Sequence, residues 1–84
     1  MPSFLIESYV PRSRHEEVSK ATRLLRAAAE QLAREGTPVR YVRTTFLPDD
    51  ETCFHIFEAP SHEAVEELRR RAALGRARIV TAVE

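Results

Sequence analysis

A chain of 84 residues can bury only about 60–65% of the surface that it exposes when unfolded, so we expect one small domain covering residues 1–84. Its 43% hydrophobic and 31% charged residues exclude disordered, collagen-like and coiled-coil classes. Thirteen basic and thirteen acidic residues cancel, which argues against a nucleic-acid partner, and no apolar run approaches the roughly 18 residues of a membrane span.

The N-terminal third predicts a strand followed by a helix. Residues 3–10 alternate and carry aromatic and β-branched side chains, which favours a strand that Pro11 ends. No basic region precedes this apolar segment, so it does not resemble a secretory signal and we expect a cytoplasmic location. Ser13 is the expected N-cap of a helix that runs to about Glu35 and stops at Gly36.

The rest of the chain predicts a β-hairpin, a second helix and a last strand. Residues 39–60 contain two arms rich in Val, Tyr, Thr, Phe and Ile, joined by the acidic turn 48–51. Ser61 is the expected N-cap of the second helix, and Gly75 its C-terminal stop. Residues 77–83 are the expected last strand.

The element order β-α-β-β-α-β indicates an α+β fold. Right-handed crossovers and short connections predict the ferredoxin-like arrangement, a four-stranded antiparallel sheet with both helices on one face and the first and third strands in its centre. The predicted core between sheet and helices is Val18, Leu25, Leu32, Phe46, Phe54, Ile56, Val65 and Leu68.

Alternation divides the hairpin into two faces, because successive side chains of a strand point to opposite sides. The face expected to pack under the helices carries Val42, Thr44, Phe46, Phe54 and Ile56. The face expected to stay open carries Tyr41, Arg43, Thr45, Cys53, His55 and Phe57, joined by Glu7 and Tyr9 from the first strand. Such a mixture is typical of a protein interface or the lining of a pocket.

The stretch GTPVRYVRTTFLPDDETCFHIFEAPSHEAV, with a strand before it and ARIVTAVE after it, resembles a small bacterial family of ferredoxin-like domains named after a nickel-binding member. The likeness lies in Tyr41-Val42, in Asp49-Asp50 of the turn, in Cys53 and in the segment 58–61. The resemblance implies a ferredoxin-like fold, a homodimer, and binding of nickel or a similar divalent ion.

Three open-face residues are the predicted metal ligands: Glu7, Cys53 and His55. Imidazole suits nickel, copper, zinc and iron, thiolate is a soft ligand, and a carboxylate in an apolar strand needs a cationic partner. The alternatives are a Glu7–Arg43 ion pair, a histidine hydrogen-bonded at an interface, and Cys53 as a small buried hydrophobic residue. Cys53 is the single cysteine, which rules out an internal disulfide.

Three further residues, Tyr9, Tyr41 and Arg43, are predicted to bind a cofactor or ligand on the same face through their hydroxyl and guanidinium groups. The two tyrosines alternatively bury their rings at an interface. His15 and His62 are expected to be solvated, where they can capture nickel adventitiously.

The favoured function is a small dimeric protein that binds a divalent metal, with nickel as the first candidate. The homodimer is expected to form through the open face, where Leu5, Tyr9, Phe57 and Val80 would otherwise leave an apolar patch in water. The alternatives are a cofactor-independent enzyme, monooxygenase- or isomerase-like, with its pocket on this face, and a partner-binding module without chemistry.

Overall fold

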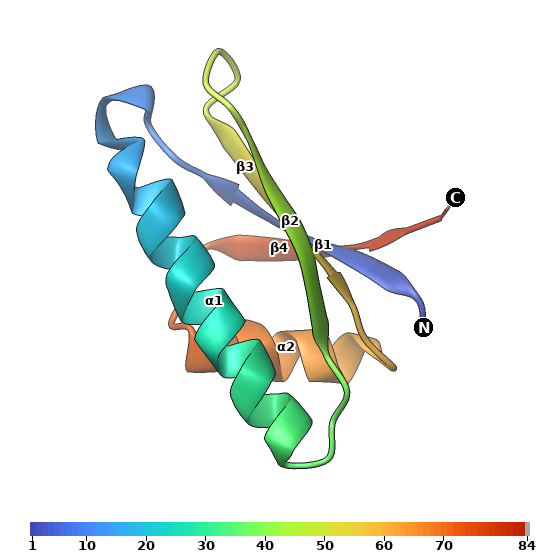
Figure 1. Ribbon diagram of the computed structural model, residues 1–84. Coiled ribbons are helices and arrows are strands. Elements are labelled where there is room, and N and C mark those ends of the chain that lie inside the picture. The colour runs from blue at the N-terminus through green and yellow to red at the C-terminus, as the bar shows by residue number, and fades with distance from the viewer. Residues whose placement is uncertain (84) are drawn as a thin grey trace.

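The computed structural model describes residues 1–83 and contains the predicted elements in the predicted order (Figure 1). The strands are β1 (Ser3–Tyr9), β2 (Arg40–Leu47), β3 (Thr52–Glu58) and β4 (Ala77–Ala82). The helices are α1 (Glu16–Arg34) and α2 (His62–Arg71), and the single 3-10 turn η1 (Arg12–Arg14) leads into α1. In the described part of the chain, neither helix is both long and apolar enough to cross a membrane.

The four strands form one antiparallel sheet in the order β2-β3-β1-β4, so β1 and β3 are the central neighbours, as predicted. Both helices pack against the same face of this sheet, because one apolar cluster takes residues from α1, α2 and the sheet. The α+β class and the element order are therefore confirmed. The other face of the sheet carries no element from the described residues (Figure 1).

The core between sheet and helices combines large apolar side chains with alanines. Leu25, Leu32, Val65 and Leu68 are buried as the helical spacing predicts. The sheet contributes Phe4, Ile6 and Phe57, of which Ile6 and Phe57 are fully buried.

The predicted faces of β3 are exchanged in the structure. Cys53, His55 and Phe57 are buried on the helical side, whereas Phe54 and Ile56 are half-buried and lie on the open side. The pairing explains this parity, since Phe57 lies opposite Phe4, whose side chain is in the core. A strand has a period of two residues, so this change of parity moves every side chain of β3 to the other face.

A β-bulge changes the parity of β2 as well. The pairing of β2 with β3 shifts between Tyr41 and Arg43, so Val42 has no partner of its own. Tyr41 and Thr44 consequently both lie on the helical side, with the Tyr41 hydroxyl 2.9 Å from the Thr44 Oγ1. The prediction that Tyr41 faces the open side is wrong for this reason, whereas the prediction for Thr44 is confirmed.

The helix ends depart from the predicted caps in two places. Ser13 lies within η1, and α1 begins after His15 without a side-chain cap. Gly36 ends α1 as predicted, with a φ of 100° that suits glycine.

Ser61 caps α2 as predicted, by accepting a 3.2 Å hydrogen bond from the Ala64 amide. The left-handed residue after α2 is Ala73, at φ 59°, and not the predicted Gly75.

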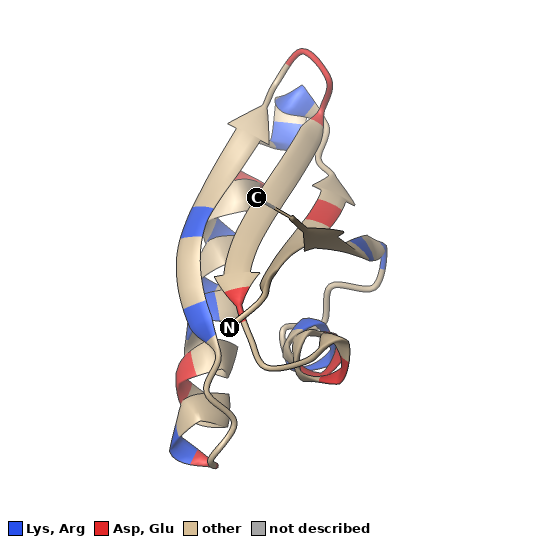
Figure 2. Ribbon diagram, turned by 90° about the vertical axis from the view of Figure 1, so that its right-hand side faces the viewer, with Lys and Arg blue, Asp and Glu red and all other residues tan. Residues whose placement is uncertain are grey.

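The acidic hairpin turn is attached to the connection between β1 and α1. The Glu51 carboxylate accepts hydrogen bonds from the Tyr9 hydroxyl at 3.2 Å and from the Arg12 amide at 2.8 Å, and Arg12 lies 3.6 Å from the Asp49 carboxylate. Figure 2 shows the red tip of the hairpin directly beside the blue residues of η1. Two segments about 40 residues apart in the sequence are thus held together at one end of the sheet.

Candidate functional site

The three predicted metal ligands do not lie together. Across β1 and β3, Glu7 lies opposite Phe54, and His55 lies opposite Ile6. Because strand side chains alternate, Glu7 points to the open side of the sheet while Cys53 and His55 point toward the helices. The predicted convergence on one face is wrong because it relied on the opposite parity of β3. Metal binding by any one of the three residues stays a prediction.

Cys53 and His55 form the buried end of a polar chain that crosses the helical side of the sheet. The Cys53 Sγ lies 3.5 Å from the His55 Nε2, and the His55 Nδ1 lies 2.9 Å from the Thr44 Oγ1. Thr22 of α1 continues the chain, with its Oγ1 3.1 Å from the Thr44 Oγ1 and 2.8 Å from the carbonyl oxygen of Val18. Three elements therefore contribute to one hydrogen-bonded chain.

The donors at one end of this chain are set by the structure. The Thr22 hydroxyl has the Val18 carbonyl oxygen and the Thr44 Oγ1 as its acceptors, and the Tyr41 hydroxyl donates to the Thr44 Oγ1. In the Thr44–His55 and His55–Cys53 contacts, the tautomer of the neutral imidazole determines which partner donates.

Burial keeps both groups of this pair uncharged near neutral pH. Cys53 and His55 are fully buried, and this burial raises the pKa of the Cys53 thiol to about 11 and lowers the pKa of the His55 imidazole to about 4. No buried side-chain nitrogen or oxygen of residues 1–83 lacks a hydrogen-bond partner. The chain is thus a satisfied, neutral network and not an activated thiolate–imidazolium pair.

The described residues of one chain do not fit a complete metal site. No three His, Cys, Asp or Glu side chains within residues 1–83 are grouped so that they could hold a metal ion. Cys53 and His55 are adjacent but are only two ligands, and binding through sulfur would require the thiol to lose its proton. His15 and His62 are exposed and lie apart in the chain, His15 between η1 and α1 and His62 at the start of α2.

The predicted ligand-binding set of Tyr9, Tyr41 and Arg43 is also divided by the sheet. Tyr41 lies on the helical side, where its ring meets Phe57 edge-on at 5.5 Å and the Arg26 guanidinium lies 5.1 Å from its centroid. Arg43 is exposed on the open side. Tyr9 is exposed at the end of β1 and donates to Glu51. Binding by any of them stays a prediction.

The open face has an apolar centre with charged residues around it. Half-buried apolar side chains come from all three of β1, β3 and β4: Leu5, Phe54, Ile56, Val80 and Ala82. Glu7, Arg78 and Arg43 lie on the same face, and the carboxylate of Glu7 is 3.6 Å from the guanidinium of Arg78. The predicted alternative of a Glu7–Arg43 ion pair is therefore wrong, since Glu7 pairs with Arg78 of β4.

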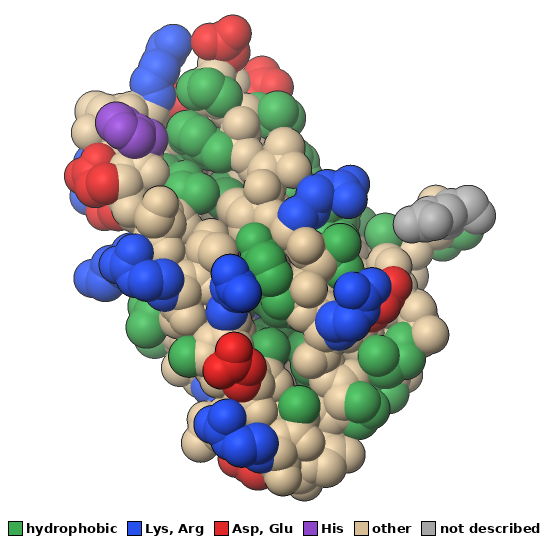
Figure 3. All heavy atoms as spheres, viewed as in Figure 1, with side chains coloured by type: hydrophobic (Ala, Val, Ile, Leu, Met, Phe, Trp, Pro, Cys, Tyr) green, Lys and Arg blue, Asp and Glu red, His purple; other side chains and the backbone are tan. Residues whose placement is uncertain are grey.

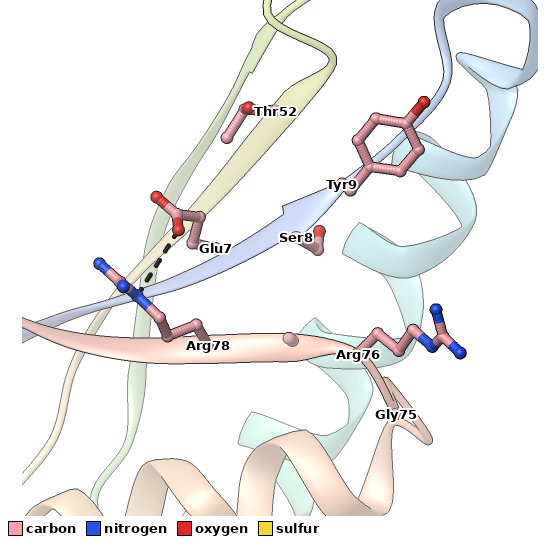
Figure 4. A pocket seen from close by; sticks show the side chains of 8 residues that line it. Glu7, Ser8, Tyr9, Thr52, Gly75, Arg76 and Arg78 are labelled. Atoms are coloured by element: carbon pink, nitrogen blue, oxygen red, sulfur yellow. Dashed lines mark ion pairs between the residues drawn. The ribbon is translucent and has the colours of Figure 1, made fainter.

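A hollow of about 400 Å³ adjoins this ion pair (Figure 4). It lies between the end of β1, the start of β3 and the segment that enters β4, with Glu7, Tyr9, Thr52 and Arg78 among its lining residues. In Figure 4 Glu7 and Arg78 point toward each other, whereas Tyr9 and Arg76 point away from them. The hollow is shallow and lies at the margin of the open face.

Sequence reasoning missed the residues that hold His55. Thr44 was assigned to the helical face and His55 to the open face, so their contact was not expected. The local pattern indicates neither the Thr22–Thr44 contact nor, away from His55, the role of Glu51 as the acceptor for Tyr9 and Arg12. A signal was present for Thr44, since a buried imidazole needs a polar neighbour on its own face.

These features define a small α+β protein with one helical face and one open, partly apolar sheet face. The family described as nickel responsive protein SCO4226-like matches residues 4–81. The chain belongs to the SCO4226-like nickel responsive protein family. No curated protein and no solved structure matches it significantly.

Proposed function

We propose that this protein is a small homodimer of ferredoxin-like subunits that binds nickel or another divalent transition metal. The observation that carries the proposal is the match of the nickel responsive family to residues 4–81, which is nearly the whole chain. The element order and the strand order β2-β3-β1-β4 support the ferredoxin-like arrangement.

The open sheet face supports the dimer. Its apolar centre, formed by Leu5, Phe54, Ile56 and Val80, is half-exposed in the isolated chain and would lose contact with water against a second copy. A two-fold axis through this face pairs the same patch with itself, and charges of both signs around it allow complementary contacts.

The metal ligands in this proposal come from more than one chain. One chain lacks a group of three suitable side chains in its described residues, whereas a dimer doubles every ligand near its axis. Glu7 is the ligand that we propose first, because its carboxylate lies on the open face and is 34% exposed. Cys53 and His55 take second place, since they are buried and face the helices.

The test is calorimetric titration of tag-free protein with nickel, in the parent and in Glu7→Gln and Arg78→Gln. We expect Glu7→Gln to weaken binding by about tenfold or more and Arg78→Gln to strengthen it, because the second change frees the Glu7 carboxylate. Glu63→Gln, an exposed carboxylate of α2, is the matched control and should bind like the parent.

Two further variants separate the remaining assignments. Loss of binding in His55→Gln alone would move the site to the buried pair. Loss only in the double variant His15→Ala/His62→Ala would place nickel on surface histidines and contradict the proposed ligands. A parent that does not bind nickel would contradict the proposed function itself.

The alternative of a cofactor-independent enzyme has one observation in its favour, the hollow of about 400 Å³ beside Glu7 and Arg78. In a metal-binding dimer, the second chain or the metal ion would occupy this hollow, and no substrate would be converted there. If the protein is such a dimer, Glu7→Gln should change its nickel affinity or its oligomeric state and should affect no catalytic activity. A substrate conversion that persists in metal-free protein and disappears in Glu7→Gln would favour the enzyme.

A further inference from the structure

A second groove lies on the helical side of the molecule. It adjoins the first hollow, and the two share the lining residues Ser8, Tyr9, Gly75, Arg76 and Ala77. Its volume is about 420 Å³, within the range of small-molecule sites. One wall is α1, the other is formed by residues 72–77 between α2 and β4, and residues 8–10 at the end of β1 also line the groove. Neither Glu7 nor Cys53 nor His55 is among its lining residues.

The wall from α1 has an amphipathic composition. Residues 17, 20, 21 and 24 follow the three- and four-residue spacing that places side chains on one helix face. Among the described residues, Leu24 is the one large hydrophobic side chain of either helix that is exposed, at 44%. Ala21 and, across the groove, Ala72 and Leu74 extend the apolar surface.

Two cations border this apolar surface. Lys20 lies on the α1 wall and Arg76 on the opposite wall, and neither forms an ion pair with a carboxylate of residues 1–83. The groove's own carboxylate, Glu17, lies 3.7 Å from Arg14 and is partly neutralised there. Figure 3, which views the molecule from the side of α1 and the edge strand β2, shows basic side chains spread among hydrophobic ones there.

We propose that this groove binds a small amphipathic anion, namely an aliphatic carboxylate whose chain covers Leu24 and whose headgroup meets Lys20 and Arg76. The apolar wall removes alkyl surface from water, and the two cations supply charge-assisted hydrogen bonds to a carboxylate. Charge selects among apolar ligands, because a cationic headgroup would meet two like charges.

The proposal is tested by NMR titration of the ¹⁵N-labelled protein with octanoate, and in parallel with octylamine, which has the same chain length and the opposite charge. We expect saturable amide shifts at residues 20–24 and 72–77, and binding of octylamine that is weaker by about tenfold or more. Shifts centred on the open sheet face, or equal binding of both amphiphiles, would overturn the proposal.

Matched variants locate the two parts of the site. The double change Lys20→Gln/Arg76→Gln should weaken octanoate binding by about tenfold, whereas Arg23→Gln, an exposed cation of α1 outside the groove, should not. Leu24→Ala should weaken it severalfold, whereas Leu47→Ala, which is exposed to a similar degree on β2, should not. Parent-like binding in both groove variants would contradict the proposal. Nickel binding is expected to be unchanged in them, so this inference and the proposed function fail independently.

Discussion

His55 occupies the core as a neutral imidazole because two strands and a helix supply its surroundings. The Cys53 thiol faces its Nε2, Thr44 of β2 faces its Nδ1, and Thr44 in turn contacts Tyr41 and Thr22 of α1. None of these neighbours carries a charge that would stabilise an imidazolium near neutral pH. Folding therefore lowers the affinity of His55 for a proton.

The first prediction at this scale concerns acid. The pKa of His55 falls from 6.5 to about 4 through burial, so the unfolded chain binds more protons between these values. The stability that His55 contributes is complete above pH 6.5 and is lost as the pH falls toward 4. Between pH 7 and pH 5 this loss amounts to about 2 kcal/mol.

Urea denaturation of the parent and of His55→Gln at pH 7, 6 and 5 measures this effect. The variant lacks the titrating ring, so its free energy of unfolding should fall less steeply with acid. His15→Gln, which removes an exposed histidine, should retain the slope of the parent. Identical slopes in all three proteins would mean that His55 binds protons equally in the folded and unfolded states, which would contradict the prediction.

Among the elements, α2 ends in an unusual way. The backbone at Ala73 is left-handed, and the amides of Ala73 and Leu74 donate back to the carbonyls of Arg70 and Arg69 at 3.1 and 3.2 Å. This is the hydrogen-bond pattern of a Schellman motif, in which glycine normally occupies the left-handed position. Alanine there brings its β-carbon too close to the following carbonyl oxygen.

Ala73→Gly should therefore stabilise the protein by about 0.5–1 kcal/mol, since relief of the left-handed backbone exceeds the greater freedom of glycine in the unfolded chain. The exposed Ala27 in the middle of α1 is the matched position, and Ala27→Gly should destabilise by about 1 kcal/mol. Thermal and urea unfolding measure both. Destabilisation by Ala73→Gly would show that the methyl group contributes contacts that outweigh the strain.

The sheet shows which parts of this molecule can be predicted from its sequence. The helices and their buried stripes were predictable, because Leu25, Leu32, Val65 and Leu68 recur at helical spacing. The parity of β3 was not, since Cys53 and Phe57 on one side and Phe54 and Ile56 on the other are all apolar, and alternation alone does not decide between them.

The candidate site depended on this undecided parity. His55 was recognised by its chemistry, but its true neighbours come from α1 and from β2 beyond a bulge, and neither is visible in the local pattern. The parity of β3 also changes how the dimer must be tested. Phe57, one of the four residues predicted at the interface, is fully buried in the core of each chain.

At the scale of the whole molecule, the sheet has one face covered by helices and one face whose apolar centre is half-exposed. Ile56 lies in this centre opposite Leu5 of the neighbouring central strand. We expect Ile56→Asp to dissociate the homodimer, because a carboxylate from each copy would meet in the buried middle of an isologous interface. The folded monomer should survive, since Ile56 is not part of the core between sheet and helices.

Light scattering of the parent should give twice the mass of the chain, and Ile56→Asp should give the mass of one chain with a native circular dichroism spectrum. Thr45→Asp, an exposed position of the edge strand β2 on the same face, is the control and should remain dimeric. Phe57→Asp should instead unfold the protein, because its charge would be placed in the core.

A parent that is monomeric at high micromolar concentration would refute the dimer. An Ile56→Asp variant that remains dimeric would show that the interface lies on another surface.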